Sequence, residues 1–154
     1  MSRQTKRCIK FGSFILLTLY IAVLIYVCFF SEDYGRDVIT SYYRYNLIPF
    51  KEIRRFYIYR DVVGIRAFLA NLFGNVLAFI PYGFFMPILR PKLRRMNQMF
   101  LAAFLLSLTI EITQLLTRVG SFDVDDLILN TAGGIAGYLL FYIMNKIRSK
   151  WDGA

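Results

Sequence analysis

The sequence contains no histidine and only two cysteines, Cys8 and Cys28. Without an imidazole, a Ser-His-Asp triad, a Cys-His pair and any zinc site that needs histidine are excluded. Cys8 precedes the first long apolar run and Cys28 lies near its far end, so we expect the two thiols on opposite sides of a membrane, with no disulfide between them. Polar tracts are absent too, which excludes a disordered chain.

Apolar residues make up 57% of the 154 positions, and aromatic residues 18%. Soluble domains contain about 45–50% apolar residues. A globule of this size could not hide so much apolar surface from water, which excludes an independent soluble enzyme and predicts residence in a bilayer. One domain of roughly 100–200 residues is the usual size, so we predict a single membrane domain over residues 1–154.

Four apolar runs are long enough to cross a hydrocarbon core of about 30 Å at about 1.5 Å per helical residue. They cover residues 11–30, 67–89, 98–116 and 127–145. The first follows a basic tail and has no small-residue cleavage site after it, which is typical of an uncleaved signal anchor. The sequence therefore predicts an all-α polytopic membrane protein with four transmembrane helices.

Basic residues exceed acidic ones, with 19 Lys and Arg against 10 Asp and Glu. Because they flank apolar runs, contact with anionic lipid is a better explanation than nucleic-acid binding. Eleven lie in three short segments, the N-terminal tail, residues 90–95 and the C-terminus, together with a single acid, Asp152. This density predicts a cell-membrane protein with both termini in the cytoplasm.

The long segment between the first two runs also has a pattern. In Lys51–Arg60, Ile53, Phe56 and Tyr57 recur at helical spacing, with charged residues largely elsewhere. This spacing predicts an interfacial amphipathic helix in the headgroup plane of the outer leaflet. It is either a connector that follows the lipid surface or a lid over a site.

Polar residues within the apolar runs fall at one depth. Asn71 and Asn75 lie in the second run, Glu111 and Gln114 in the third, and Asn130 in the fourth. At about 1.5 Å per residue, all lie roughly 0–12 Å below the predicted outer boundary. Three separate helices would therefore offer polar groups to the same layer of the membrane.

Glu111 is the costly member of this set, because an acid at the membrane centre costs about 2.5 kcal/mol or more. It is expected to face the interior of the bundle. Gln114 follows three positions later on the same face, and Arg118 could reach down to the carboxylate or up to a phosphate. Interhelical hydrogen bonding is the structural alternative to a binding or catalytic site.

The segment Asp123-Val124-Asp125-Asp126 allows two interpretations that are compatible with each other. Asp123 and Asp126 suit a helix start, as a cap and a carboxylate in the positive first turn. The same acids could contact a metal or a ligand, although the sequence names no metal and no cofactor. Asp126 and Asn130 are one turn apart and would share a face.

Small residues spaced four apart recur in the second and fourth runs. They are Ala70, Gly74 and Ala78 in the second run, and Gly133 and Gly137 in the fourth. Such spacing lets helix backbones approach closely. We predict that the second and fourth spans touch, and a homo-oligomer through glycine faces is also possible.

Ordered motifs across residues 46–133 resemble those of the VanZ-like family of small bacterial membrane proteins. They are Asn46-Leu47-Ile48-Pro49-Phe50, Asn71-xxx-Asn75-xxx-Phe79-x-Pro81-x-Gly83, Glu111-xx-Gln114, Arg118 and Asp123-xx-Asp126-xxx-Asn130-xx-Gly133. The resemblance implies a polytopic cell-membrane protein whose founding relatives are associated with tolerance to glycopeptide antibiotics, teicoplanin in particular. It implies no settled molecular activity.

The preferred hypothesis is a polar pocket in the outer leaflet that binds a membrane lipid or a lipid-linked cell-wall component. Its expected ligand-binding residues are Asn71, Asn75, Glu111, Gln114, Arg118, Asp123, Asp126 and Asn130. The alternative is a membrane enzyme acting on such a lipid, with Glu111 as acid or base. A transporter and a purely structural scaffold are the remaining possibilities.

Overall fold

The computed structural model describes residues 2–31 and 42–152. Its elements, in chain order, are α1 Arg3–Phe29, β1 Tyr45–Asn46, α2 Lys51–Ile58, α3 Arg60–Val63, α4 Ile65–Leu89, the 3₁₀ helix η2 Pro91–Arg94, α5 Met96–Thr117, β2 Phe122–Asp123 and α6 Val124–Asp152. Helices dominate, so the predicted all-α class is confirmed. The exception is the short pairing of β1 with β2, which the sequence did not predict.

The four long helices α1, α4, α5 and α6 correspond to the four predicted membrane spans, and the first ends one residue earlier than predicted. The apolar helical segments run over Arg3–Phe29, Leu72–Leu89, Met96–Thr117 and Val124–Ser149. α1 begins before the predicted span and α6 extends beyond it, because a helix continues into its basic flank without a break in hydrogen bonding. The chain is a multi-pass membrane protein.

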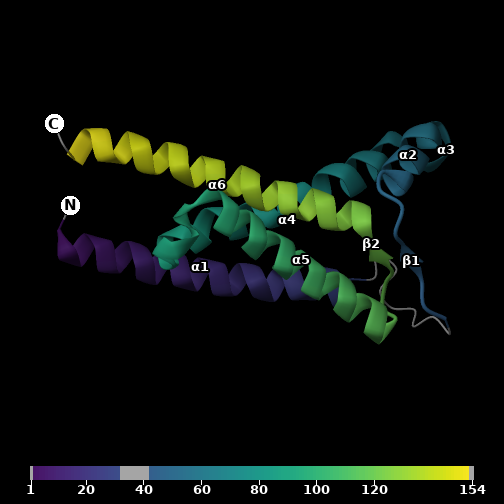
Figure 1. Ribbon diagram of the computed structural model, residues 1–154, viewed down its shortest axis with the longest axis horizontal. Helices are drawn as coiled ribbons and strands as arrows, with labels where there is room; N and C mark the ends of the chain where they lie inside the picture. Colours follow the sequence, from purple (N-terminus) through teal and green to yellow (C-terminus); the bar gives the residue numbers. More distant parts are fainter. Residues whose placement is uncertain (1, 32–41, 153–154) are drawn as a thin grey trace.

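The bundle is elongated, and its two ends differ (Figure 1). One end carries the start of α1, the end of α6 and η2, and we call it the terminal end. The other carries β1, α2, β2 and the start of α6, and we call it the loop end. α1 and α6 run along the length of the bundle, with α4 and α5 between the two ends.

α4 and α6 form the most extensive helix contact, as the small-residue spacing predicted. A Cβ atom built on Gly133 would lie 2.1 Å from the carbonyl oxygen of Val76, and one on Gly137 would lie 2.0 Å from that of Ile80. Only glycine permits such an approach, since its missing side chain lets two helix backbones touch. This glycine face of α6 is therefore used within the chain.

The partner surface on α4 differs from the predicted one. A Cβ atom on Gly74 would meet nothing within 4 Å, so Gly74, at the centre of the predicted stripe, does not form the contact. Gly83 does, because a Cβ atom there would lie 1.9 Å from the carbonyl oxygen of Gly134. The spacing of small residues gave the right helix pair but the wrong face of α4.

α1 is the most exposed of the long helices, with 11% of its most apolar stretch buried. Phe11 is 68% exposed and Val23 is 61% exposed, which suits contact with acyl chains rather than water. A hydrogen bond of 2.6 Å from the Tyr20 hydroxyl to the Ala78 carbonyl ties α1 to α4. α1 therefore packs against the rest mainly through one face.

The predicted amphipathic helix is confirmed as α2, except for one residue of its predicted apolar face. Ile53 and Phe56 are half-buried and Arg54 and Arg55 are exposed, but Tyr57 is 57% exposed. β1 and β2 pair in parallel, with Tyr45 opposite Phe122 and Asn46 opposite Asp123. Strand pairing and α2 together bring residues 42–58 onto the first turn of α6.

Candidate functional site

Buried and half-buried polar side chains gather at the loop end, and we call them the loop-end cluster. They come from β1, α4, α5, β2 and α6. The cluster consists of Asn46, Asn75, Ser107, Glu111, Gln114, Asp123, Asp125, Asp126 and Asn130. Six of these nine residues were predicted as ligand-binding residues, and the contacts below bring them together.

Glu111 and Asp123 lie at the centre of the cluster. Glu111 is 2% exposed, and its Oε2 accepts the backbone N–H of Asp123 at 2.9 Å. The Oδ1 of Asp123 accepts the backbone N–H of Asp125 at 2.9 Å and the side-chain amide of Asn46 at 3.0 Å. The first of these bonds caps α6, which confirms the predicted cap.

Asp125 fixes α2 from a distance of more than seventy residues along the chain. Its carboxylate accepts three backbone N–H groups, from Phe50, from Glu52 at 2.8 Å and from Ile53 at 3.2 Å. The first residues of a helix leave such donors without a partner within the helix. Phe50 precedes α2 with φ 64° and makes no side-chain cap bond, so Asp125 of α6 supplies the missing cap.

Two amide side chains join the long helices to one another. Asn75 in α4 donates its side-chain N–H to the carboxylate of Asp126 in α6. Asn130 in α6 donates to the hydroxyl of Ser107 in α5 at 3.0 Å. Both Asn130 and Ser107 are buried, where an amide without a partner would be costly.

Gln114 and Arg118 lie at the edge of the cluster. Gln114 donates to the carbonyl oxygen of Cys28 at 3.0 Å, which ties α5 to the end of α1. Arg118 ends α5 with φ 59°, and its guanidinium carbon lies 4.6 Å from the centre of the Tyr43 ring. Its Nη2 also lies 3.4 Å from the Tyr43 hydroxyl. The side chain therefore rests on an aromatic ring, a geometry typical of a cation–π contact.

Asn71 lies in α4, but its side chain is outside the described residues. Three members of the cluster were not predicted as site residues: Asn46, Ser107 and Asp125. Asn46 begins the motif that ends at Phe50, and Asp125 belongs to the acidic segment 123–126. Both positions therefore carried a signal in the sequence. Ser107 carried none, because a serine in an apolar helix is unremarkable in sequence.

Burial raises the pKa of the Asp123 carboxyl, which lies just outside the fourth membrane span. Its hydrogen bonds from Asp125 and Asn46 act in the opposite direction, and repulsion from the carboxylates of Asp125 and Glu52 adds to the rise. Within residues 2–31 and 42–152, no group of three or more acidic or cysteine side chains is arranged to hold a metal ion. The acids of the described cluster instead accept hydrogen bonds from the chain itself.

Comparison with known proteins gives a consistent result. Residues 17–145 match the family described as VanZ/LLP1. The chain is 31% identical over 133 residues to "Protein VanZ" of Enterococcus faecium. The aligned region covers 85% of this chain and 74% of that protein. No solved structure matches the chain. The match includes all of the loop-end cluster.

Proposed function

The chain belongs to the VanZ/LLP1 family, and from that premise we propose that its loop end binds a membrane lipid or a lipid-linked cell-wall component. Binding there would modulate susceptibility to glycopeptide antibiotics of the teicoplanin type. We further propose that both termini are cytoplasmic, which would direct the loop end to the outer leaflet of the cell membrane, where wall assembly takes place.

The observation that supports this proposal is a connected set of polar side chains. Asn75 of α4 and Glu111 of α5 are bonded to Asp126 and Asp123, and Asp123 and Asp125 in turn are bonded to the segment 42–58. A buried set of this kind is costly in a membrane unless it is fully hydrogen-bonded. Here Glu111, Asp123 and Asp125 are bonded to backbone N–H groups. They hold a rigid support at headgroup depth, on which less buried groups can meet a ligand.

Arg118 and Tyr43 are the groups at this edge best suited to a phosphate. A guanidinium can donate two parallel hydrogen bonds to phosphate oxygens, and an aromatic ring beneath it limits its freedom. Asn75 and Asp126, both half-buried, provide an amide and a carboxylate for sugar hydroxyls or an amine. We assign Gln114 and Asn130, together with Asn71, to the supporting wall of the same site.

The alternative is an enzyme in which Glu111 transfers a proton to or from the lipid. The burial of Glu111 in α5 favours this candidate, because an active site usually shields the reacting group from water. Glu111→Gln keeps the shape and the acceptor oxygen but removes proton transfer. If the variant reaches wild-type abundance and keeps the antibiotic phenotype, the catalytic alternative is wrong and the binding proposal stands.

Lipid mass spectrometry of the purified full chain tests the binding proposal. Arg118→Gln should lower the amount of one co-purifying phosphate-bearing lipid about tenfold or more, because it removes a charged hydrogen-bonding partner. Arg54→Gln is the matched control, since Arg54 is an exposed arginine of α2 at the same end. Unchanged lipid content in Arg118→Gln, or equal losses in both variants, would contradict the proposal.

Orientation has its own test, because the chain has a free exposed cysteine near its N-terminus, Cys8. In a Cys28→Ser variant, a membrane-impermeant thiol reagent on intact cells should leave Cys8 unlabelled. In a Cys8→Ser/Cys28→Ser background, Arg118→Cys should be labelled, because it is then the one cysteine in the sequence. The opposite pattern would put the loop end in the cytoplasm and exclude an outer-leaflet site.

A further inference from the structure

The terminal end contains a groove that the proposed function does not use. Two adjoining cavities, of about 280 Å³ and about 460 Å³, share the lining residues Ile9, Ile88, Arg94 and Arg148. Because they share these walls, they form one continuous groove, which we call the terminal groove. Its sides come from α1, α4, η2 and α6. The larger cavity alone falls within the range of about 300–1,000 Å³ that is common for ligand sites.

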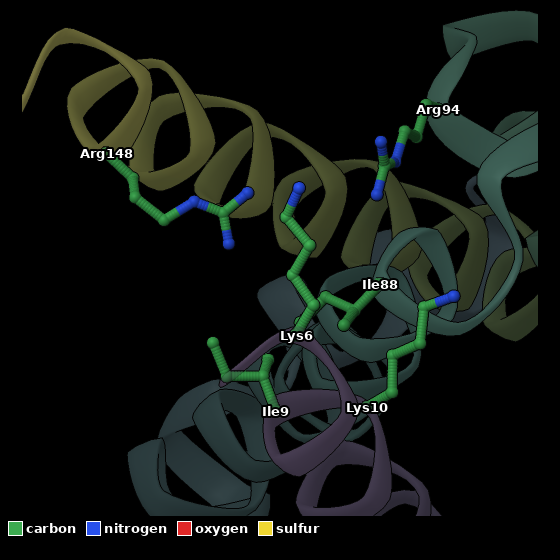
Figure 2. Close-up of a pocket in the computed structure, with 6 residues that line it drawn as sticks. All are labelled: Lys6, Ile9, Lys10, Ile88, Arg94 and Arg148. Carbon is green, nitrogen blue, oxygen red and sulfur yellow. The ribbon is translucent and has the colours of Figure 1, made fainter. Parts of the chain in front are cut away.

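One part of the terminal groove is strongly basic. Four of the six residues that line the smaller cavity are cations, Lys6, Lys10, Arg94 and Arg148, and none is acidic. In Figure 2 the charged ends of Arg148, Lys6 and Arg94 are directed to the same space above Ile9, while Lys10 extends to the other side. These cations come from three elements far apart in the sequence, so the fold itself gathers them.

Both arginines are held in place by the protein. The Nε of Arg94 donates to the carbonyl oxygen of Pro87 at 3.1 Å, and its guanidinium lies 5.8 Å from the centre of the Phe141 ring. The Nη2 of Arg148 donates to the side-chain oxygen of Asn145 at 2.7 Å. Fixed guanidinium groups lose less conformational freedom when an anion binds.

The other part of the terminal groove is apolar. Phe84, Phe85, Ile88, Phe141 and Met144 line the larger cavity next to the same two arginines. A soluble anion would fill the basic part and leave this surface uncovered. An anionic amphiphile would fill both, because it carries a charged head and a hydrocarbon chain.

We propose that the terminal groove is a binding site for an anionic phospholipid. The phosphate lies between Lys6, Arg94 and Arg148, and one acyl chain follows the apolar wall past Phe85 and Met144. Basic pockets between membrane helices bind such headgroups in this way. This site is at the opposite end from the loop-end cluster, so it does not depend on the function proposed above.

The test uses the purified full chain in detergent, mixed with equal amounts of phosphatidylglycerol and phosphatidylethanolamine. Native mass spectrometry then measures how much of each lipid stays bound. We expect the wild type to retain phosphatidylglycerol preferentially. Lys6→Gln/Arg148→Gln should lower that retention about 25-fold, since each basic residue near an anionic lipid contributes roughly a factor of five.

Arg7→Gln/Lys146→Gln is the matched control, because it removes the same charge from the same two helices at exposed positions outside both cavities. It should change retention by less than about twofold on the same scale. Equal losses in both double variants would mean that a general basic surface attracts the lipid, and would overturn the proposal. Equal retention of the two lipids by the wild type would overturn it as well.

A second pair of variants tests the apolar part without changing charge. Met144→Trp places a larger ring in the cavity wall, whereas Ile143→Trp adds the same ring at a neighbouring, similarly exposed position that does not line the cavity. Met144→Trp should reduce phosphatidylglycerol retention about tenfold, because an occupied volume excludes the chain. Equal retention by the two variants would mean that the acyl chain does not lie in the groove, and would overturn the proposed binding mode.

Discussion

At the loop end, Glu111, Asp123 and Asp125 are buried and their carboxylates accept backbone N–H groups, whereas at the terminal end Lys6 and Arg148 line an open groove. In the first arrangement the charged groups are buried and hydrogen-bonded within the protein. In the second they are accessible to a ligand that enters the groove. Buried, hydrogen-bonded acids therefore mark the loop end and groove-lining cations mark the terminal end, and the two groups serve different purposes.

This difference indicates which charges hold the molecule together. Removing a buried acceptor leaves several donors without partners, which costs the full penalty of burying them. Removing an exposed cation leaves nothing behind and changes stability by less than about 0.5 kcal/mol. We therefore expect the loop end to govern folding of the segment 42–58 and the terminal end to govern lipid contact.

The two ends are joined by the glycine contact of α4 with α6, so breaking it should disturb both and produce the largest effect. Gly137→Ala directs a Cβ atom against the Ile80 backbone and should lower the free energy of unfolding by about 3 kcal/mol. Thermal unfolding in detergent measures the change. Gly74→Ala is the control, because a Cβ atom there meets nothing within 4 Å. Similar stability of the two variants would mean that close packing at Gly137 does not stabilise the fold.

A change at Asp125 should affect the loop end alone. Asp125→Asn replaces a carboxylate that accepts three N–H groups by an amide that donates as well, and should cost about 2–3 kcal/mol. Hydrogen exchange should accelerate at the start of α2 and remain unchanged in η2. Asp126→Asn, at the next position of α6, should leave exchange in α2 as it is. Unaltered protection of α2 in Asp125→Asn would show that the cap does not hold the helix.

The smallest effect is expected from the titration of Asp123. Burial raises its pKa in the folded state, so the folded chain binds a proton more readily than the unfolded chain does. Stability should then increase as the pH falls from about 7 towards the ordinary carboxyl range near about 4. Both described bonds of the Asp123 carboxylate end on Oδ1, so a proton on Oδ2 preserves them.

The measurement for Asp123 is the difference in unfolding midpoint between the wild type and Asp123→Asn across that pH range. The difference isolates this residue, because the other carboxyl groups titrate in both proteins. The unfolding midpoint of the wild type should rise relative to that of Asp123→Asn as the pH falls. A fall relative to the variant would mean that the hydrogen bonds, and not burial, govern the pKa of this carboxyl group.

Much of the candidate site was predictable. Glu111, Gln114 and Asn130 were expected at one depth because helical rise converts sequence position directly into depth. The cap formed by Asp123 followed from local chemistry, since its donor is two residues away. Partners across the chain could not be predicted: Asn46 with Asp123, or Asp125 with α2, depends on how residues 42–58 fold back. Ser107 became part of the cluster only because α6 presents Asn130 to it.

The sequence alone determined the four spans, the amphipathic segment and the pairing of the second span with the fourth, because hydrophobic length and residue spacing are local properties of a chain. Tertiary structure decided which face of α4 meets the glycines, which acid caps α2, and that Lys6, Arg94 and Arg148 surround one groove. Those outcomes depend on how helices rotate and pack against one another. Rotation about a helix axis leaves a local trace only where a polar residue such as Glu111 marks one face, since the apolar positions between such residues look alike on every side.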